Sequence, residues 1–106
     1  MPAPTIGDLR IYLGQSSYSD DQLSSALAAE LAAQARVVRD SARPIDGPWD
    51  ADVTEALKRR VARNLAMRGI PLAMFSGDQE LGGLVPPNRD PEVRRLEGPV
   101  RKLKTG

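Results

Sequence analysis

The sequence predicts an all-α fold, a small bundle of three to four helices with a long loop and an extended basic C-terminal tail. Capping residues bracket several segments, and apolar residues recur within them at helical spacing. Aromatic residues make up only 4% of the 106 residues, so Leu, Val, Ile and Ala must build the core, which suits closely packed helices. The predicted helices span about 5–14, 19–40, 50–69 and 90–97. A chain of this size is one domain, which we divide into a helical body over 1–85 and a C-terminal docking helix and tail over 86–106.

The first two helices carry clear start signals. Thr5 and Asp8 have the spacing of a capping box, and Gly14 can end that helix. Ser19 precedes two aspartates and predicts the start of a long helix that runs to about Asp40. The apolar stripe of this long helix is predicted to be Leu23, Leu27, Leu31, Ala35 and Val38. Its many alanines either pack within an ordinary core or form a face for another subunit.

The central helix, DADVTEALKRRVARNLAMRG, has both ends specified in the sequence. Asp50 can cap its first turn and Gly69 can take the left-handed conformation that ends a helix. Its stripe of core residues is predicted to be Val53, Leu57, Val61 and Leu65. Trp49, just before the cap, is expected to pack on the first turn of this helix, with an exposed binding anchor as the alternative.

The polar residues of the central helix fall on two sides. Arg59 and Arg63 point away from the apolar stripe, so they are expected to face water or the channel of an assembly. Asn64 and Arg68 fall inside the apolar arc. Each of them therefore needs a polar partner, in this chain or in a neighbouring subunit.

A compact helix is predicted at 90–97, in the segment DPEVRRLEG. Asp90 is its cap, Pro91 occupies the first helical position and Gly98 ends it. Pro99 prevents continuation, so the remaining residues are predicted to be a basic extended end. A helix this short is marginal alone and must dock on another surface.

The composition excludes several classes of function. The chain has no Cys and no His, which removes thiol nucleophiles, imidazole bases, disulfides and nearly every zinc or transition-metal site. We therefore predict that the protein is not an enzyme and has no metal or other cofactor. No segment is long and apolar enough for a membrane span, and the N-terminal sequence lacks the features of a signal peptide, so we expect the protein in a cytoplasm.

Charge is unevenly distributed along the chain. Residues 1–85 hold 9 basic and 11 acidic side chains, whereas residues 86–106 hold 6 basic and 3 acidic ones. A basic tail on a mildly acidic body suggests a polyanion or an acidic protein surface as partner.

The order of these features resembles the small head–tail connector proteins of long-tailed bacteriophages, in particular the adaptor (head-completion) proteins of phages that infect high-GC bacteria. The resemblance covers nearly the whole chain, and its most specific segments are ALKRRVARNLAMRG at 56–69 and RDPEVRRLEGP at 89–99. The chain departs from the pattern at Val100, where an aromatic residue or His is often seen. This departure puts only the detail of that contact in doubt.

The resemblance implies a structural virion protein of the phage neck, made in the host cytoplasm during assembly. Copies of the chain, commonly twelve, would form a ring beneath the portal protein of the DNA-filled head. The ring would receive the next neck protein, a stopper or tail terminator, and DNA would pass through it without being read. Arg59, Arg63, Arg68 and Trp49 are candidate inter-subunit or channel residues.

The C-terminal segment is the predicted contact with the portal. Its candidate residues are Val93, Arg94, Arg95, Leu96, Pro99, Val100, Arg101, Lys102, Leu103 and Lys104. The alternative is that this segment folds back on its own body or closes the ring on a neighbouring protomer. For a portal contact, removal of residues 89–106 is expected to leave a folded body that no longer attaches to heads, whereas for a packed arm it is expected to disrupt folding or assembly.

Two other functions were weighed against the connector. A small nucleic-acid-binding module would use the basic side chains Arg59, Arg63, Arg94, Arg95, Arg101, Lys102 and Lys104, but the base-reading residues expected among them are missing. An enzyme would need a nucleophile and a base. Ser16 and Ser17 have no histidine to activate them.

Overall fold

The protein folds as an all-α bundle in a computed structural model that describes residues 3–14, 18–68 and 86–102. Four α-helices are described, α1 (Ile6–Leu13), α2 (Asp20–Ala35), α3 (Ala51–Arg68) and α4 (Pro91–Glu97). Three short 3-10 turns accompany them, at Asp40–Ala42, Pro87–Arg89 and Gly98–Val100. The predicted all-α class is confirmed. Most of the long loop and the end of the tail lie outside the described residues.

The starts of the first two helices follow the sequence signals. Thr5 accepts a hydrogen bond from the Asp8 N–H, and the Asp8 carboxylate accepts one from the Thr5 N–H, which completes a capping box. Ser19 and Gln22 form a second capping box at the start of α2. Both predicted starts are therefore confirmed.

The end of α2 differs from the prediction. The helix was expected to reach about Asp40, but it ends at Ala35 because the next residues bind the C-terminal segment. The Lys102 N–H donates to the Val37 carbonyl at 2.7 Å, and the Arg39 N–H donates to the Val100 carbonyl at 2.9 Å. The Lys102 ammonium also donates to the Ala35 carbonyl at 2.9 Å, where a cation complements the helix dipole.

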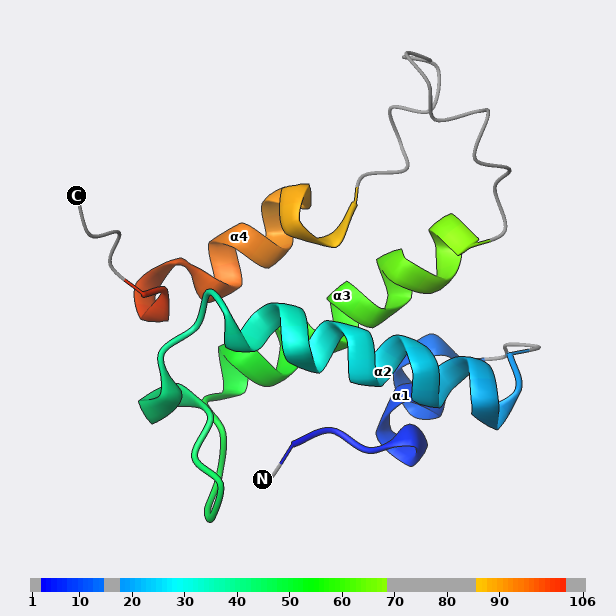
Figure 1. Cartoon of the computed structure of the whole chain (residues 1–106), viewed down its shortest axis with the longest axis horizontal. Helices are drawn as coiled ribbons and strands as arrows, with labels where there is room; N and C mark the ends of the chain where they lie inside the picture. Colours follow the sequence, from blue (N-terminus) through cyan, green and yellow to red (C-terminus); the bar gives the residue numbers. More distant parts are fainter. Residues whose placement is uncertain (1–2, 15–17, 69–85, 103–106) are drawn as a thin grey trace.

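Helix α3 is the centre of the bundle, with α2 crossing it on one side and α4 lying along another (Figure 1). All four residues of its predicted stripe are buried, which confirms that prediction. The main apolar cluster joins α1, α2 and α3 and consists of Leu9, Leu23, Ala26, Val61 and Leu65. A second cluster, around Val38, Ala42 and Val53, lies where the chain leaves α2 and enters α3. Trp49 and Val100 pack against this second cluster, so Trp49 contacts the first turn of α3 as predicted.

The buried face of α2 is rotated from the predicted stripe. Leu23 is buried, but Leu27 and Leu31 are only partly buried and Ala35 is exposed. The fully or nearly buried positions are instead Leu23, Ala26, Glu30 and Gln34. Two polar side chains take core positions because α3 presents polar partners to them. The small Ala26 gives the close approach between α2 and α3.

Helix α4 begins as predicted, with the Asp90 carboxylate accepting hydrogen bonds from the N–H groups of Glu92 and Val93. Its end differs in detail. Gly98 has right-handed helical angles (φ −47°, ψ −50°), and the chain continues through a 3-10 turn. Pro99, rather than a left-handed glycine, accompanies the end of the α-helix.

Candidate functional site: the arginine cluster between α3 and α4

Two arginines of α3 hold the first residue of the α4 segment. The Nε atom of Arg59 lies 3.0 Å from both carboxylate oxygens of Asp90, and the Nε atom of Arg63 lies 2.6 Å from one of them. Asp90 is fully buried, whereas the side chains of Arg59 and Arg63 are 34% and 26% exposed. The same carboxylate caps α4, so one side chain both starts this helix and joins it to α3.

The environment of Asp90 shifts its acidity. Burial acts to raise the pKa of this carboxyl, but hydrogen bonds from Arg63, Arg59 and the N–H groups of Val93 and Glu92 outweigh burial and lower the pKa to about 2. Asp90 is therefore ionised at neutral pH. The ion pairs that hold α4 persist across the physiological range.

A second arginine contact lies deeper in the same interface. Arg60 is fully buried and forms a bidentate ion pair with Glu97 of α4, with Nε to Oε2 at 2.6 Å and Nη2 to Oε1 at 2.7 Å. Its Nη1 donates to the side-chain oxygen of Asn88 at 2.7 Å. Two parallel bonds of this kind fix orientation as well as distance. Glu97 is also fully buried, so the pair is shielded from solvent.

The buried pair is extended by polar side chains of α2. The amide of Gln34 donates to Glu97 at 2.8 Å and to the Val53 carbonyl at 3.1 Å. Glu30 lies 3.6 Å from Arg60 and accepts a hydrogen bond from Asn64 at 2.8 Å. One buried polar network thus connects α2, α3 and α4 and specifies how the three helices meet.

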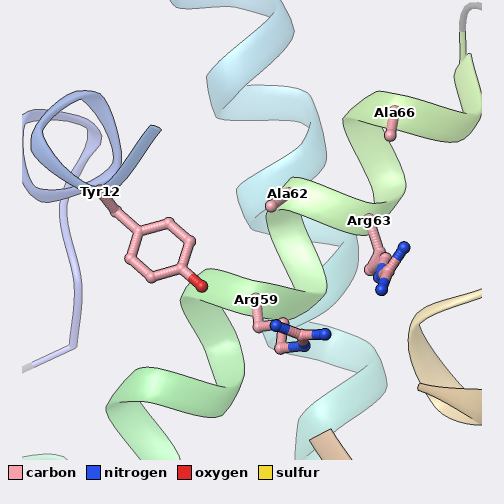
Figure 2. Close-up of a pocket in the computed structure, with 5 residues that line it drawn as sticks. All are labelled: Tyr12, Arg59, Ala62, Arg63 and Ala66. Carbon is pink, nitrogen blue, oxygen red and sulfur yellow. The ribbon is translucent and has the colours of Figure 1, made fainter. Parts of the chain in front are cut away.

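A pocket of about 210 Å³ lies beside this cluster, between α1 and α3. Figure 2 shows the Tyr12 ring reaching from α1 with its hydroxyl directed toward Arg59, while Ala62 and Ala66 keep the α3 side shallow. Burial and the nearby Glu55 raise the pKa of Tyr12, so its hydroxyl is protonated at neutral pH. Tyr12 and the two arginines make this pocket polar on one side and apolar on the other.

The arginine cluster gives Arg59 and Arg63 a partner that the sequence did not predict. Both bind Asp90 within the chain, and both side chains remain partly exposed. Their placement in the channel of an assembly stays a prediction. The prediction for Asn64 and Arg68 is confirmed in that both have polar partners, because Arg68 donates to Asn64 at 2.6 Å and to Ser25 at 3.2 Å. Arg68 is nevertheless exposed, so it lies at the solvent-facing end of the network and is not a buried charge.

The predicted portal residues divide into inner and outer sets. Val93 and Leu96 are buried within the chain, at 0% and 7% exposure, where α4 packs on α3. Arg94, Arg95, Pro99 and Lys102 are exposed, and Val100 and Arg101 are half-buried. Leu103 and Lys104 lie outside the described residues. In the single chain, α4 therefore folds back on its own body, which is the alternative arrangement considered above for this segment.

Sequence reasoning missed the residues at the centre of the network, namely Arg60, Glu97, Glu30 and Gln34. One signal was present. Asp90 and Glu97 are seven residues apart, which places both acids on one face of α4 opposite an arginine-rich helix.

The described residues include no group of three or more acidic side chains that could hold a metal ion. None of the described helices is long and apolar enough to cross a membrane.

Comparison with protein-family models, curated proteins and solved structures found no match. The arrangement is that of a charged, interlocked helix interface that positions one segment of the chain on another.

Proposed function

We propose that the chain is a structural virion protein of the phage neck, an adaptor ring that joins the portal of the DNA-filled head to the next neck or tail protein and forms part of the DNA conduit. The proposal starts from the resemblance of two separate stretches, 56–69 and 89–99, to head–tail connector proteins. One structural observation supports treating those stretches as a single feature. Ion pairs join the first stretch, on α3, to the second stretch, which contains α4.

Each stretch supplies half of the charged interface. Residues 56–69 contribute Arg59, Arg60 and Arg63, and residues 89–99 contribute Asp90 and Glu97. A substitution in one half leaves a buried or partly buried charge in the other half without its partner. The two stretches therefore form one structural unit, so the resemblance concerns one interface of the fold.

The geometry favours the connector over the nucleic-acid-binding module. A nucleic-acid-binding module would use Arg59 and Arg63 to contact DNA, but both form ion pairs with Asp90. Among the described residues of the C-terminal segment, Arg95 pairs with Glu92, and the Lys102 ammonium binds the end of α2. Too few basic side chains remain in this set to follow a phosphate backbone.

The surface left for the portal is the outer face of α4. Val93 and Leu96 face inward, so a portal contact would use the exposed Arg94 and the region of Pro99. A basic contact of this kind suits an acidic groove and speeds encounter more than it adds affinity. The proposed portal contact therefore uses the charged outer face of α4, and the apolar Val93 and Leu96 are not its anchors.

Attachment to heads tests the proposal. DNA-filled heads that carry the portal but lack neck proteins, from the phage whose genome encodes this chain, are mixed with purified protein and separated by density-gradient centrifugation. Wild-type protein should sediment with the heads and appear as a ring at the portal vertex in electron micrographs. Arg94→Glu should attach poorly, whereas the control Arg36→Glu, an exposed charge at the end of α2, should attach normally. Heads that never retain the wild-type protein would rule out the adaptor.

A further inference from the structure

The connection between α2 and α3 forms a braced loop at residues 43–49 that projects beyond the helices (Figure 1). Its base is closed by a hydrogen bond from the Asp50 N–H to the Ala42 carbonyl at 3.1 Å. The Arg43 guanidinium lies 4.5 Å from the centre of the Trp49 ring, a cation–π contact across the two ends of the loop. Such closed, self-braced loops are often binding elements.

The tip of this loop presents one apolar and one acidic side chain. Ile45 is 99% exposed, and Asp46 beside it is also exposed. Pro44 and Pro48 restrict the backbone on either side, and Gly47 takes the positive φ of 123° that the bend requires. Asp46 makes no ion pair with a described residue. Prolines and the contacts at its base thus restrain the loop, and its tip presents an apolar side chain to water.

A complementary pocket lies on the first two turns of α3. It has a volume of about 340 Å³ and is lined by Trp49, Ala51, Thr54, Glu55 and Lys58. Trp49 gives it an apolar wall, and Lys58 is a half-buried cation without an ion pair to the described residues. Glu55 is exposed, so water continues to solvate its carboxylate.

We propose that the tip of loop 43–49 docks into the Trp49–Lys58 pocket of a second copy of this chain, with Ile45 against the indole and Asp46 paired with Lys58. Apolar and charged features match in one contact. An exposed isoleucine meets an apolar wall, and the Asp46 carboxylate meets the Lys58 ammonium, whose charge within the chain acts on Asp8 without a direct ion pair. A contact between the tip of one copy and the pocket of the next can continue from copy to copy around a ring, which is the arrangement that the proposed adaptor requires.

This inference rests on the proposed function in one respect, since an adaptor ring requires a contact between copies. The purified chain alone can test it, however. A failure of head attachment with the contact intact would count against the adaptor only. A missing contact with attachment intact would count against this interface only.

The native side chains allow a direct experiment, because a carbodiimide joins a carboxylate to an amine that lies in contact with it. Isotope-labelled and unlabelled protein are mixed and treated, and cross-linked peptides of mixed label are measured by mass spectrometry. The matched control is the cross-link to Lys58 from Asp21, an exposed carboxylate at the start of α2. Docking raises the local concentration of the Asp46 carboxylate at the Lys58 amine, so the mixed-label Asp46–Lys58 cross-link should form at least about tenfold faster than the control.

One substitution separates docking from chance collision. Ile45→Ser should bring the rate of the Asp46–Lys58 cross-link down to that of the control, and circular dichroism should be unchanged because Ile45 contributes nothing to the core. Equal rates for the Asp46–Lys58 and Asp21–Lys58 cross-links, or a fast rate that survives Ile45→Ser, would overturn the interface.

Discussion

Arg60 and Glu97 meet through two parallel hydrogen bonds of 2.6 and 2.7 Å, and neither side chain is exposed to solvent. The contact joins α3 to α4 across the long connection between them. A buried pair of this kind is weak support for stability as such, because desolvation offsets most of the attraction. Its geometry instead fixes where α4 lies on α3 and in which register.

Removing one partner of this pair should be far more damaging than removing both. Arg60→Met leaves Glu97 buried without its cation, and we expect the free energy of unfolding to fall by about 3–5 kcal/mol. Arg60→Met combined with Glu97→Leu should recover most of that loss. Urea denaturation followed by circular dichroism measures both variants, with the exposed Arg94→Met as control. A single variant as stable as wild type would contradict the buried geometry.

Asp90 should dominate the response of the fold to acid. Its folded pKa of about 2 lies below the unfolded value, so its contribution is fully present above the unfolded pKa and is lost as pH falls through the folded one. The shift corresponds to about 2 kcal/mol. Asp90→Asn keeps a capping residue but removes the charge, so this variant should be less stable at pH 7 and should lose less stability between pH 5 and pH 2. Asp21→Asn, at an exposed position of α2, is the control and should follow the wild-type curve.

Close packing of α2 on α3 should make Ala26 intolerant of larger side chains. Ala26 is fully buried, and Ala26→Leu is expected to lower the free energy of unfolding by about 1–3 kcal/mol through overpacking. The exposed Ala29→Leu is the matched control, for which a change within about 0.5 kcal/mol is expected. Thermal melts of the two variants at equal concentration provide the comparison. Equal melting temperatures would mean that α2 presents a different face to α3.

Truncation of the chain should test whether α4 is part of the folded body. Deleting residues 89–106 removes Asp90 and Glu97 and exposes the apolar surface under Val93, so the free energy of unfolding should fall by several kcal/mol, roughly the cost of breaking a buried ion pair or more. Thermal melts followed by circular dichroism compare the truncated chain with the full-length protein. A fully stable 1–88 fragment would show that α4 is not part of the folded body.

The sequence predicts well those features that depend on neighbouring residues. The capping boxes at Thr5 and Ser19 and the Asp90 cap are short-range patterns, and all three are present. The apolar stripe of α3 was also predicted correctly. Local geometry determines these features, so the helix starts and the class of fold follow from the pattern of residues alone.

The charged interface could not be predicted in the same way. Periodicity assigns one dry and one wet side to a helix, and Arg60, seven residues after Val53, lies beside the apolar stripe. Periodicity does not show that α2 and α4 both cover α3, nor that Glu97 is the partner of Arg60. Glu30 and Gln34 displace leucines from the α2 core face only because α3 and α4 supply their partners. The early end of α2 has the same origin, since Val37 and Arg39 bind residues some 60 positions away in sequence. Two features of the sequence agree with this arrangement, namely the spacing of Asp90 and Glu97 and the position of Arg60 beside the apolar stripe.

The pairing of residues 37–39 with 100–102 has a mechanical consequence. Tension applied to the end of the chain beyond Lys102 would be borne first by two backbone hydrogen bonds, from Lys102 to Val37 and from Arg39 to Val100, and by the bond from the Lys102 ammonium to the Ala35 carbonyl. Once those yield, the load passes to the bidentate Arg60–Glu97 pair, which must break both of its bonds together. Pulling on the C-terminus in an optical trap should therefore give two successive ruptures, a weak one at the bridge and a stronger one at the buried ion pair.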